Sequence, residues 1–438
     1  MTEYLKYYYE NKEATDRRIA EDTERYRKGD ATVRFTDREG RAVKVKNLRI
    51  RQKAHAFKFG CNIFMLDQFP DEEHNSAYRE KFPELFNYAI VPFYWSDYEV
   101  EEGKTRDGLS PTYVYRRPGP EQVLRYTEEK GLDVKGHCLM WHRFLPDWLP
   151  EDGEKTMEYL TRRISHIAEL YGERIRDFDI VNETNDRQPY EPYEKKIPFD
   201  CAGRTFAYAD GVLPTNRLFI NETTECTWQY FRRENSAFYL QIETLLAKGR
   251  RIDAIGMQYH LFRGPEALKK QLDALIHPTR LFDCLDYYGR FGRPIHVSEI
   301  TVPAYADREN SLEEQAEITE FLYRLWFSHK DMEAIVWWNL VDGTAAYAPL
   351  GSSDGENYYR AGLLNYDMTE KPVYRTLNRL INEEWKTTLD VGAADGSYSF
   401  RGFFGDYEIT AETEDGTVLS GTFSLARGEE NTCTLSLA

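Results

Sequence analysis

Short hydrophobic runs alternate with longer polar stretches through the middle of the chain. Eight of these runs are each followed by a stretch of helical length, and they cover residues 57–63, 88–92, 134–139, 178–181, 218–221, 254–258, 295–299 and 334–338. Eight buried strands that alternate with helices are typical of a (β/α)8 barrel. Two intervening segments, residues 156–171 and 228–246, carry apolar positions at helical spacing, which supports this prediction.

The two ends of the chain have other patterns. Residues 1–29 have the pattern of one charged amphipathic helix that ends at Gly29. Residues 31–50 alternate around a polar turn, which predicts a β-hairpin. Further alternating strands are predicted at residues 398–404, 407–413, 418–425 and 432–437. Because two strands alone are marginally stable, we expect the hairpin to pair with this C-terminal sheet.

These patterns predict an α/β fold, a (β/α)8 TIM barrel with a small all-β accessory domain. The expected divisions are a charged helix over residues 1–29, the hairpin over 30–51, the barrel over 52–386 and a β-sandwich-like domain over 387–438. The accessory domain combines the C-terminal strands with the hairpin.

Composition narrows the function classes. Among 438 residues, 57 Lys and Arg face 74 Asp and Glu, a net charge of −17, which argues against binding to nucleic acid. The absence of 18 consecutive apolar residues argues against a membrane partner. The first thirty residues lack the apolar core of a signal peptide, which predicts a cytoplasmic protein, or a secreted one if a leader was trimmed. Six cysteines without C-x-x-C spacing predict buried thiols.

Two glutamates stand at the carboxyl ends of predicted strands. The fourth run leads into Asn182 and Glu183, and the seventh ends at Glu299. Catalytic groups of a (β/α)8 barrel lie at these strand ends, so both carboxylates are expected at one rim. Glycosidic bond cleavage uses two facing carboxylates, one protonated and one ionised. Either glutamate alone could form a structural ion pair, but two on strands four and seven favour catalysis.

Imidazole, amide and indole side chains also follow strand ends. Such groups hydrogen-bond sugar hydroxyls and stack on the apolar faces of sugar rings. They are His137, His142, Trp148, Gln258, His260 and Trp338. A lone histidine is usually a satisfied core residue, but His142 and His260 both lie beyond strand ends, which favours a functional role.

At these positions the chain resembles glycoside hydrolase family 10, the retaining endo-β-1,4-xylanase family of clan A. Residues 136–148 resemble the family's G-H-T-L-V-W-H-x-x-x-P-x-W, and residues 178–183 resemble its W-D-V-V-N-E. Residues 256–261 are similar to G-x-Q-x-H-L, and residues 297–299 to the I-T-E that presents the nucleophile. Smaller similarities in the same order extend the match over residues 52–385.

The resemblance implies an endo-1,4-β-xylanase activity (EC 3.2.1.8) by a retaining mechanism. It implies that Glu299 is the nucleophile and Glu183 the acid/base, supported by Asn182 and His260. The implied substrate-binding residues are His137, His142, Trp148, Gln258, Trp338, Tyr94, Trp95 and Tyr347. The expected partner is an oligosaccharide or polysaccharide, and no cofactor or metal is expected.

The chain departs from the family pattern at three places. The family's E-N-x-M-K-W is replaced over residues 90–95, where only Trp95 remains. The Asp that follows the nucleophile by two residues is Thr301, so the contact between His260 and Glu299 lacks its usual charged partner. The second Trp of the family's W-G-x-x-D-x-x-S-W is lost, with Tyr347 as the nearby aromatic residue. These changes predict a preference for short or substituted β-linked oligosaccharides over polymeric xylan.

Three alternatives stay open at this stage. A related clan A β-glycosidase acting on another β-linked oligosaccharide would use the same two glutamates. The chain could also be a non-catalytic carbohydrate-binding barrel, although the retention of both glutamates argues against this. A metal-dependent barrel hydrolase could use the histidines at positions 55, 137, 142, 260 and 296, but it needs paired ligands such as H-x-H on the first strand, where only His55 stands nearby.

Overall fold

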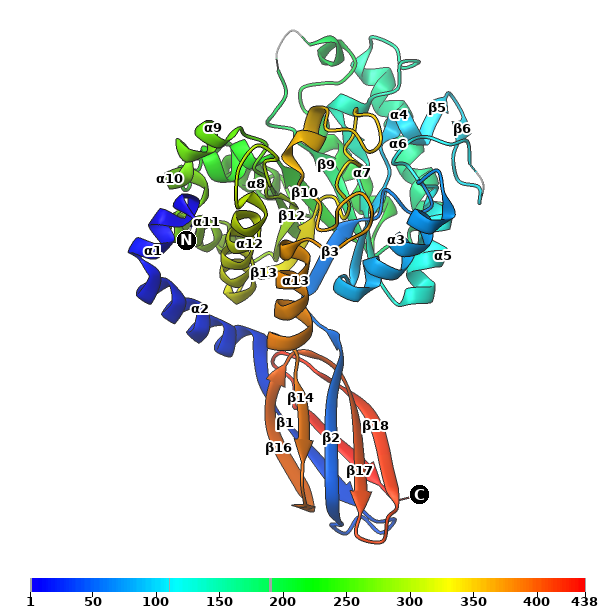
Figure 1. The fold of residues 1–438 in the computed structure, drawn as a ribbon. Helices are drawn as coiled ribbons and strands as arrows, with labels where there is room; N and C mark the ends of the chain where they lie inside the picture. Colours follow the sequence, from blue (N-terminus) through cyan, green and yellow to red (C-terminus); the bar gives the residue numbers. More distant parts are fainter. Residues whose placement is uncertain (1, 110, 189–190, 438) are drawn as a thin grey trace.

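A computed structural model describes residues 2–109, 111–188 and 191–437 of the chain. Eight parallel strands close into a barrel surrounded by helices, because β9 pairs with β10 at the seam (Figure 1). In barrel order the strands are β3 (Lys58–Asn62), β4 (Tyr88–Pro92), β7 (Asp133–His137), β9 (Asp177–Asn182), β10 (Arg217–Glu222), β11 (Ala254–His260), β12 (Ile295–Thr301) and β13 (Met332–Trp337). The predicted (β/α)8 barrel is therefore confirmed.

The outer helices cover the barrel. They are α3 (Glu72–Leu85), α5 (Pro120–Lys130), α6 (Gly153–Tyr171), α7 (Cys201–Val212), α8 (Ala237–Ala247), α11 (Pro278–Tyr288), α12 (Ser311–Ser328) and α13 (Pro372–Arg379), with the short helices α4 (Trp95–Tyr98), α9 (Pro265–Lys269) and α10 (Leu272–Leu275). Helix α6 begins where the Asp152 carboxylate accepts from two backbone N–H groups, and it buries Leu160, Ile164 and Ile167 along one face.

Shorter elements fill the connections. They are β5 (Glu99–Glu101), β6 (Lys104–Thr105), β8 (Met140–Trp141), the 3₁₀ turns η2 (His142–Phe144), η3 (Pro192–Lys195), η5 (Gly289–Phe291) and η6 (Gly355–Tyr359), and the π turns η4 (Glu225–Gln229) and η7 (Leu380–Glu384). The predicted helix over 228–246 is split into η4 and α8. The buried Trp228 indole donates to the Gln258 carbonyl at 3.0 Å, and the Ser236 hydroxyl accepts from Arg232 N, so the intervening backbone turns.

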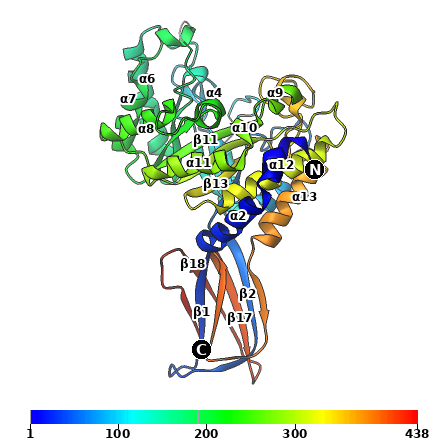
Figure 2. The same cartoon turned by 90° about the vertical axis from the view of Figure 1, so that its left-hand side faces the viewer.

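The N-terminal segment also differs from its prediction. It forms η1 (Glu3–Leu5), α1 (Lys6–Glu10) and α2 (Lys12–Arg27), and α2 lies along α12 (Figure 2). The helix ends at Arg27 and Gly29 lies in β1. The buried Arg27 guanidinium donates to backbone carbonyls, among them Met332 at 2.8 Å, which draws the chain toward the barrel.

The accessory domain is a sandwich of two sheets. One has the order β16 (Ser397–Phe403), β1 (Lys28–Thr36), β19 (Thr432–Ser436). The other has the order β14 (Thr388–Val391), β2 (Lys44–His55), β17 (Gly405–Thr413), β18 (Val418–Leu425), with β15 (Ala394–Asp395) on β2. The N-terminal strands thus pair with C-terminal ones, as expected.

The two N-terminal strands do not form the predicted hairpin with each other. Only an isolated bridge between Thr36 and Ala42 joins this region, and β1 and β2 lie in opposite sheets. Each strand buries alternate side chains, such as Val33 and Ile50, in one core between the sheets. The two strands therefore meet face to face, with C-terminal strands at their edges.

The sandwich attaches to the barrel at the N-terminal ends of the barrel strands. A cavity of about 750 Å³ lies at this junction, lined by Lys58, Asp133 and Met332 from the starts of barrel strands and by Phe404 and Leu425 from the sandwich. The accessory domain therefore lies at the end opposite the rim that carries the chemistry of such barrels.

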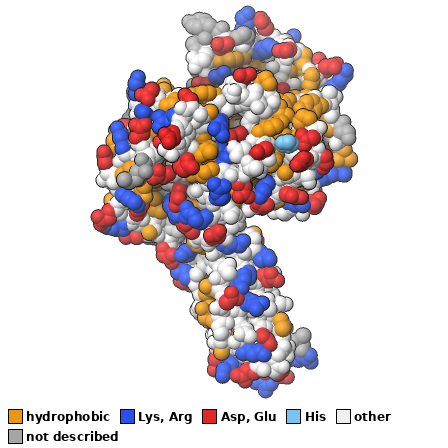
Figure 3. Space-filling model, viewed as in Figure 1, with side chains coloured by type: hydrophobic (Ala, Val, Ile, Leu, Met, Phe, Trp, Pro, Cys, Tyr) orange, Lys and Arg blue, Asp and Glu red, His pale blue; other side chains and the backbone are white. Residues whose placement is uncertain are grey.

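Charged side chains of both signs lie at the surface, and the cysteines lie mostly inside. On the face shown in Figure 3, acidic and basic side chains are interspersed over the barrel and the sandwich. Across the described ranges, no helix is long and apolar enough to cross a membrane. The six cysteines are free thiols, and all but the half-buried Cys226 are buried.

Candidate functional site

A cavity of about 570 Å³ opens at the C-terminal rim of the barrel. Both glutamates found by the sequence analysis line it. Its residues are Tyr94, Arg116, Arg117, His137, Trp141, Arg143, Phe144, Glu183, Thr223, Thr224, Glu225, Gln258, His260, Phe262, Arg263, Glu299, Trp338, Ala346, Tyr347 and Glu356. The carboxyl ends of seven of the eight barrel strands, or the loops that follow them, supply these side chains.

Glu183 directly follows β9 and is buried at the cavity wall. Its backbone has φ 55°, and its N–H donates to the Asn221 carbonyl at 3.0 Å, which fixes the direction of the side chain. Burial raises the pKa of Glu183 to about 8, and the nearby charges of Glu299 and Glu222 act in the same direction. The Gln258 amide, which donates to Oε1 at 2.8 Å, opposes this shift only in part. Glu183 is therefore mostly protonated at neutral pH, the state from which a carboxyl can give up a proton.

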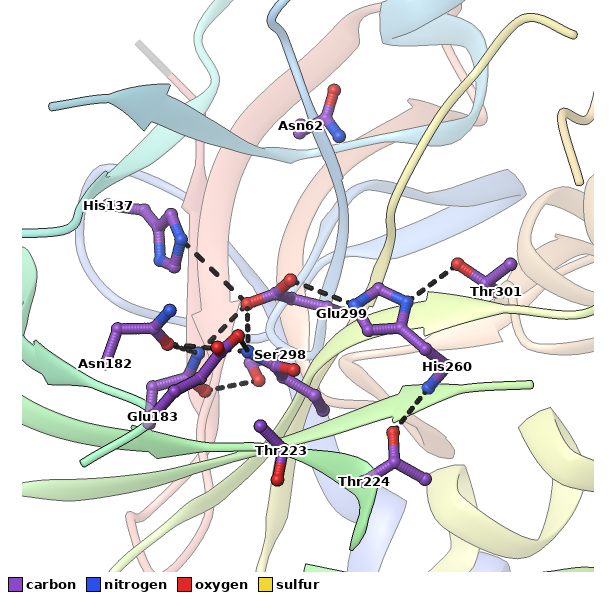
Figure 4. Close-up of polar contacts among 12 residues, drawn as sticks. Asn62, His137, Asn182, Glu183, Thr223, Thr224, His260, Ser298, Glu299 and Thr301 are labelled. Carbon is purple, nitrogen blue, oxygen red and sulfur yellow. Dashed lines mark hydrogen bonds and ion pairs between the residues drawn. The ribbon is translucent and has the colours of Figure 1, made fainter. Parts of the chain in front are cut away.

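Glu299 is held by four neighbours at the end of β12. Its Oε1 accepts from Asn221 Nδ2 at 3.0 Å and from Gln258 Nε2 at 3.1 Å. Its Oε2 lies 3.1 Å from His260 Nε2, and His137 Nε2 lies 3.9 Å from Oε1 (Figure 4). The contacts with Asn221, Gln258 and His260 are hydrogen bonds and hold both oxygens of the carboxylate in one orientation, whereas His137 is a close neighbour only.

Thr301 takes part in this arrangement through His260. The Thr301 hydroxyl lies 2.8 Å from His260 Nδ1, on the far side of the ring from Glu299. A hydroxyl can donate to Nδ1, which leaves a proton on Nε2 for the carboxylate. An uncharged partner therefore stands where the family pattern has a carboxylate, and the contact between His260 and Glu299 is kept.

Two asparagines join the strands beneath the carboxylates. Asn221 Nδ2 donates to Asn182 Oδ1 at 2.7 Å, and the Ser298 hydroxyl donates to Asn221 Oδ1 at 2.5 Å. Asn182 Nδ2 is buried and has no hydrogen-bond partner in the described parts of the chain. Since buried donors are normally satisfied, a hydroxyl of a bound ligand fits this amide.

His137 is oriented by a buried charge pair. Its Nδ1 lies 2.7 Å from Asp179 Oδ2, and Lys135 Nζ lies 2.9 Å from the same oxygen. Burial opposes ionisation of Asp179, but the Lys135 charge and the His137 bond hold the pKa of this carboxyl below its ordinary value. The ionised Asp179 fixes a proton on Nδ1, so Nε2 faces Glu299.

Not every residue predicted to bind substrate faces the cavity. Tyr94, His137, Gln258, His260, Trp338 and Tyr347 line it. His142, Trp148 and Trp95 do not, which corrects the expectation for these three side chains. His142 packs on Tyr193, and burial lowers its pKa to about 3.

The two tryptophans point away from the cavity for a local reason. Both indoles hydrogen-bond to Glu99 at 3.0 Å, Trp148 to its carbonyl and Trp95 to its carboxylate. Trp95 begins α4, and its ring lies 6.3 Å from that of Trp148. Both rings therefore support the loop after β4 and do not line the cavity.

Several residues that line the cavity were not predicted from the sequence. Arg143 and Phe144 occupy variable positions of the 136–148 motif, so the motif itself could have pointed to them. Arg116 and Arg117 come from a loop without periodicity and had no such signal. Glu222 is a further buried carboxyl beside the site; burial raises its pKa to about 7, and it accepts from Asn185 N at 2.8 Å.

The histidines considered as metal ligands do not converge. His55 lies at the junction with the sandwich, and His296 Nε2 lies 2.8 Å from Glu333, which lines that same junction at the start of β13. Over residues 2–109, 111–188 and 191–437, no group of three or more His, Cys, Asp or Glu side chains is arranged to hold a metal ion. The carboxylate pair is therefore the centre of the candidate chemistry.

Comparisons with known proteins agree with this geometry. The family model described as Glycosyl hydrolase family 10 matches residues 95–379. A β-1,4-xylanase of Dictyoglomus thermophilum is 26% identical over 249 residues, covering 52% of this chain and 66% of that protein. Endo-1,4-beta-xylanase B of Neocallimastix patriciarum is 24% identical over 283 residues, covering 61% of this chain and 29% of that protein.

A solved structure shows the same fold. Xylanase 10B from Thermotoga petrophila RKU-1, in complex with xylobiose, superposes with a TM-score of 0.59 at 21% identity, covering 75% of this chain and 95% of that one. The chain spans less than two thirds of the length of each of the two curated relatives named above. The family match covers well over half of the chain, from α4 to the end of α13. This chain belongs to glycosyl hydrolase family 10.

Proposed function

We propose that the chain is a retaining glycoside hydrolase that cleaves β-1,4-linked xylo-oligosaccharides. Membership of the family, the xylanases among its relatives and the pair of buried carboxylates support this assignment. Glu299 acts as nucleophile and Glu183 as acid/base.

One observation carries the retaining mechanism. The same nitrogen, Gln258 Nε2, donates to Glu183 Oε1 at 2.8 Å and to Glu299 Oε1 at 3.1 Å. The Oε1 atoms of Glu183 and Glu299 are therefore separated by at most the sum of these two hydrogen-bond lengths. Retaining pairs are separated by about 5 to 5.5 Å, whereas inverting pairs need roughly 6.5 to 9.5 Å to admit a water molecule.

The mechanism follows from the protonation states. Glu299 Oε attacks the anomeric carbon, and the bond to the leaving oxygen breaks as the Glu183 proton moves to that oxygen. Esterified Glu299 carries no charge, so the pKa of Glu183 falls and its carboxylate accepts a proton from water. The hydroxide oxygen displaces Glu299, which restores both carboxyl groups and releases a sugar of unchanged anomeric configuration.

The glycone side of the cavity favours short or substituted oligosaccharides. Of the aromatic residues at 93–95, only Tyr94 lines the cavity, and the Arg117 guanidinium lies 3.9 Å from the centre of its ring. Phe93 is buried against Tyr171 and Phe178. At this part of the wall a sugar therefore meets the Tyr94 ring in place of the amide and ammonium groups of the family pattern, which favours stacking.

Leaving-group dependence tests the assignment. Glu183→Ala is expected to lower turnover of unactivated oligosaccharides about 10²- to 10⁴-fold, the contribution of a general acid. Turnover of nitrophenyl glycosides, whose leaving group needs no proton, should fall much less in this variant. Azide should restore turnover, because it replaces water as the nucleophile in the second step. Equal losses on both substrate types, without rescue by azide, would refute the role of Glu183. Binding of oligosaccharides without any nitrophenol release from wild type would indicate a non-catalytic barrel.

A further inference from the structure

One side of the rim is bridged by a segment of the loop after β4. Arg116 Nη1 donates to Asn339 Oδ1 at 2.7 Å and to the Thr344 carbonyl, and the Tyr115 hydroxyl donates to the Ala345 carbonyl at 3.4 Å. Asn339 and Ala345 belong to the loop after β13. Residues 111–117, termed the bar below, therefore join the loops of two strands across the end of β3 that lies between them.

The bar is fixed by buried arginines. Arg106 donates to the carbonyls of Thr112 at 2.9 Å and Arg117 at 2.7 Å. Arg117 Nε donates to Asp97 Oδ2 at 2.7 Å while its guanidinium stacks on Tyr94. Arg106, Arg116 and Arg117 are each less than 10% exposed. These contacts hold the bar as a wall of the cavity.

The bar lies on the side of the nucleophile. The Trp338 ring lies 5.7 Å from His137 and 5.8 Å from His260, the two histidines beside Glu299. Phe64 lies 5.4 Å from Trp338, and the Arg116 guanidinium lies 5.5 Å from Phe64. This series of contacts leads from the nucleophile to the bar.

The acid/base has different neighbours. Arg143 Nε lies 3.7 Å from Glu183 Oε2, and Arg143 is also paired with Asp186. Because Glu183 gives its proton to the leaving oxygen, the leaving group lies on this side. The sugar that becomes attached to Glu299 lies on the other side, toward the bar.

Arg116 has unused hydrogen-bonding capacity. It is 2% exposed and lines the cavity, yet its Nε and Nη2 have no partner, and no carboxylate lies within ion-pair distance, among the residues that the structure describes. Glu356 faces the same cavity, where burial raises its pKa. A donor and an acceptor at a closed end can bind the hydroxyls of a terminal sugar.

We infer that the bar closes the glycone end of the cavity and that this hydrolase acts from the non-reducing end of its substrate, with Arg116 binding the terminal sugar. This inference rests on the proposed function. It also accounts for the lining of the cavity, to which β3 and its following loop contribute no residue among the described positions. Arg116 covers Phe64, which follows that strand.

The experiment uses β-1,4-linked xylotetraose, xylopentaose and xylohexaose that carry a fluorescent label at the reducing end. At early times wild type is expected to remove the same number of sugars from all three substrates. The reason is that the non-reducing terminus lies against the closed end, at a fixed distance from the bond that is cleaved. Internal cleavage, in which the number of sugars removed varies with substrate length, would overturn the inference and leave the proposed function standing. Failure to cleave any β-linked oligosaccharide would overturn both.

Variants test whether the bar sets this length. Arg116→Ala is expected to lower kcat/KM at least tenfold and to yield glycone products of two or more lengths. Arg116→Lys, which keeps the charge but loses the planar fork, should be intermediate. Lys104→Ala, an exposed position of the same loop, is the matched control and should keep the wild-type product pattern. If the folded Arg116→Ala variant gives the same products as wild type, the bar does not set the product length. If the variant does not fold, the products of wild type still decide whether the enzyme acts from the non-reducing end.

Discussion

Replacing Glu183 by glutamine should stabilise the barrel, by an amount that grows with pH. Burial raises the pKa of Glu183 to about 8 from an ordinary value of 4.5. The folded protein therefore keeps a proton that the unfolded chain releases. For a carboxyl whose pKa is raised on folding, stability is lost as pH rises from the unfolded to the folded pKa, and the full penalty is present above the folded value.

The magnitude follows from the two pKa values. Each unit of difference corresponds to 1.36 kcal/mol, so the penalty is about 1 kcal/mol at pH 5, about 3 kcal/mol at pH 7 and about 5 kcal/mol above pH 8. Glutamine does not titrate, has nearly the same volume and still offers an oxygen to the Gln258 amide. Glu183→Gln should therefore gain these amounts of unfolding free energy relative to wild type.

Urea unfolding at pH 5, 7 and 9, followed by tryptophan fluorescence, measures this gain. All eight tryptophans lie between residues 95 and 385, so the signal reports on the barrel alone. Glu158→Gln, at an exposed position of α6, is the matched control and should change stability little at any pH. A constant difference between Glu183→Gln and wild type from pH 5 to 9 would refute the argument that burial holds this carboxyl protonated.

Three further changes test the site. Glu299→Gln should abolish turnover of all glycosides while leaving the fold intact, since the amide cannot attack the anomeric carbon; turnover within tenfold of wild type would exclude it as nucleophile. His260→Ala should lower kcat about tenfold or more with an unchanged melting temperature, because a half-buried hydrogen bond to Glu299 is lost; unfolding would instead indicate a structural histidine. Arg143→Ala removes a cation that lowers the pKa of Glu183, so the alkaline limb of kcat/KM, expected near pH 8, should move to higher pH; a downward shift would contradict the contact.

The order and type of the barrel strands could be predicted from the sequence. A strand buried on both sides is largely apolar, and each of the eight runs, such as residues 88–92, overlaps a strand in the structure. The position of Glu183 and Glu299 at strand ends also follows from the sequence, because the closure of a parallel barrel brings all carboxyl ends to one rim.

The tertiary structure decided which sheet of the sandwich each strand with alternating buried and exposed residues joins. Alternation in residues 31–50 shows that one face of each strand is buried, but it contains no information about the edge partner. The pairing of β1 with β16 and of β2 with β17 depends on contacts between segments more than 300 residues apart. Those contacts, and not the local pattern, separated the two N-terminal strands.

The sequence determined which side chains stand near the rim, and the tertiary structure decided which of them face the cavity. His142 and Trp148 follow the same strand as His137, yet the turn at η2 directs them into packing contacts. Arg116 reaches the cavity only because Asn339 and Thr344, over 200 positions later, supply its acceptors. Side-chain direction in loops depends on such distant partners, whereas strand periodicity is fixed by neighbouring residues along the chain.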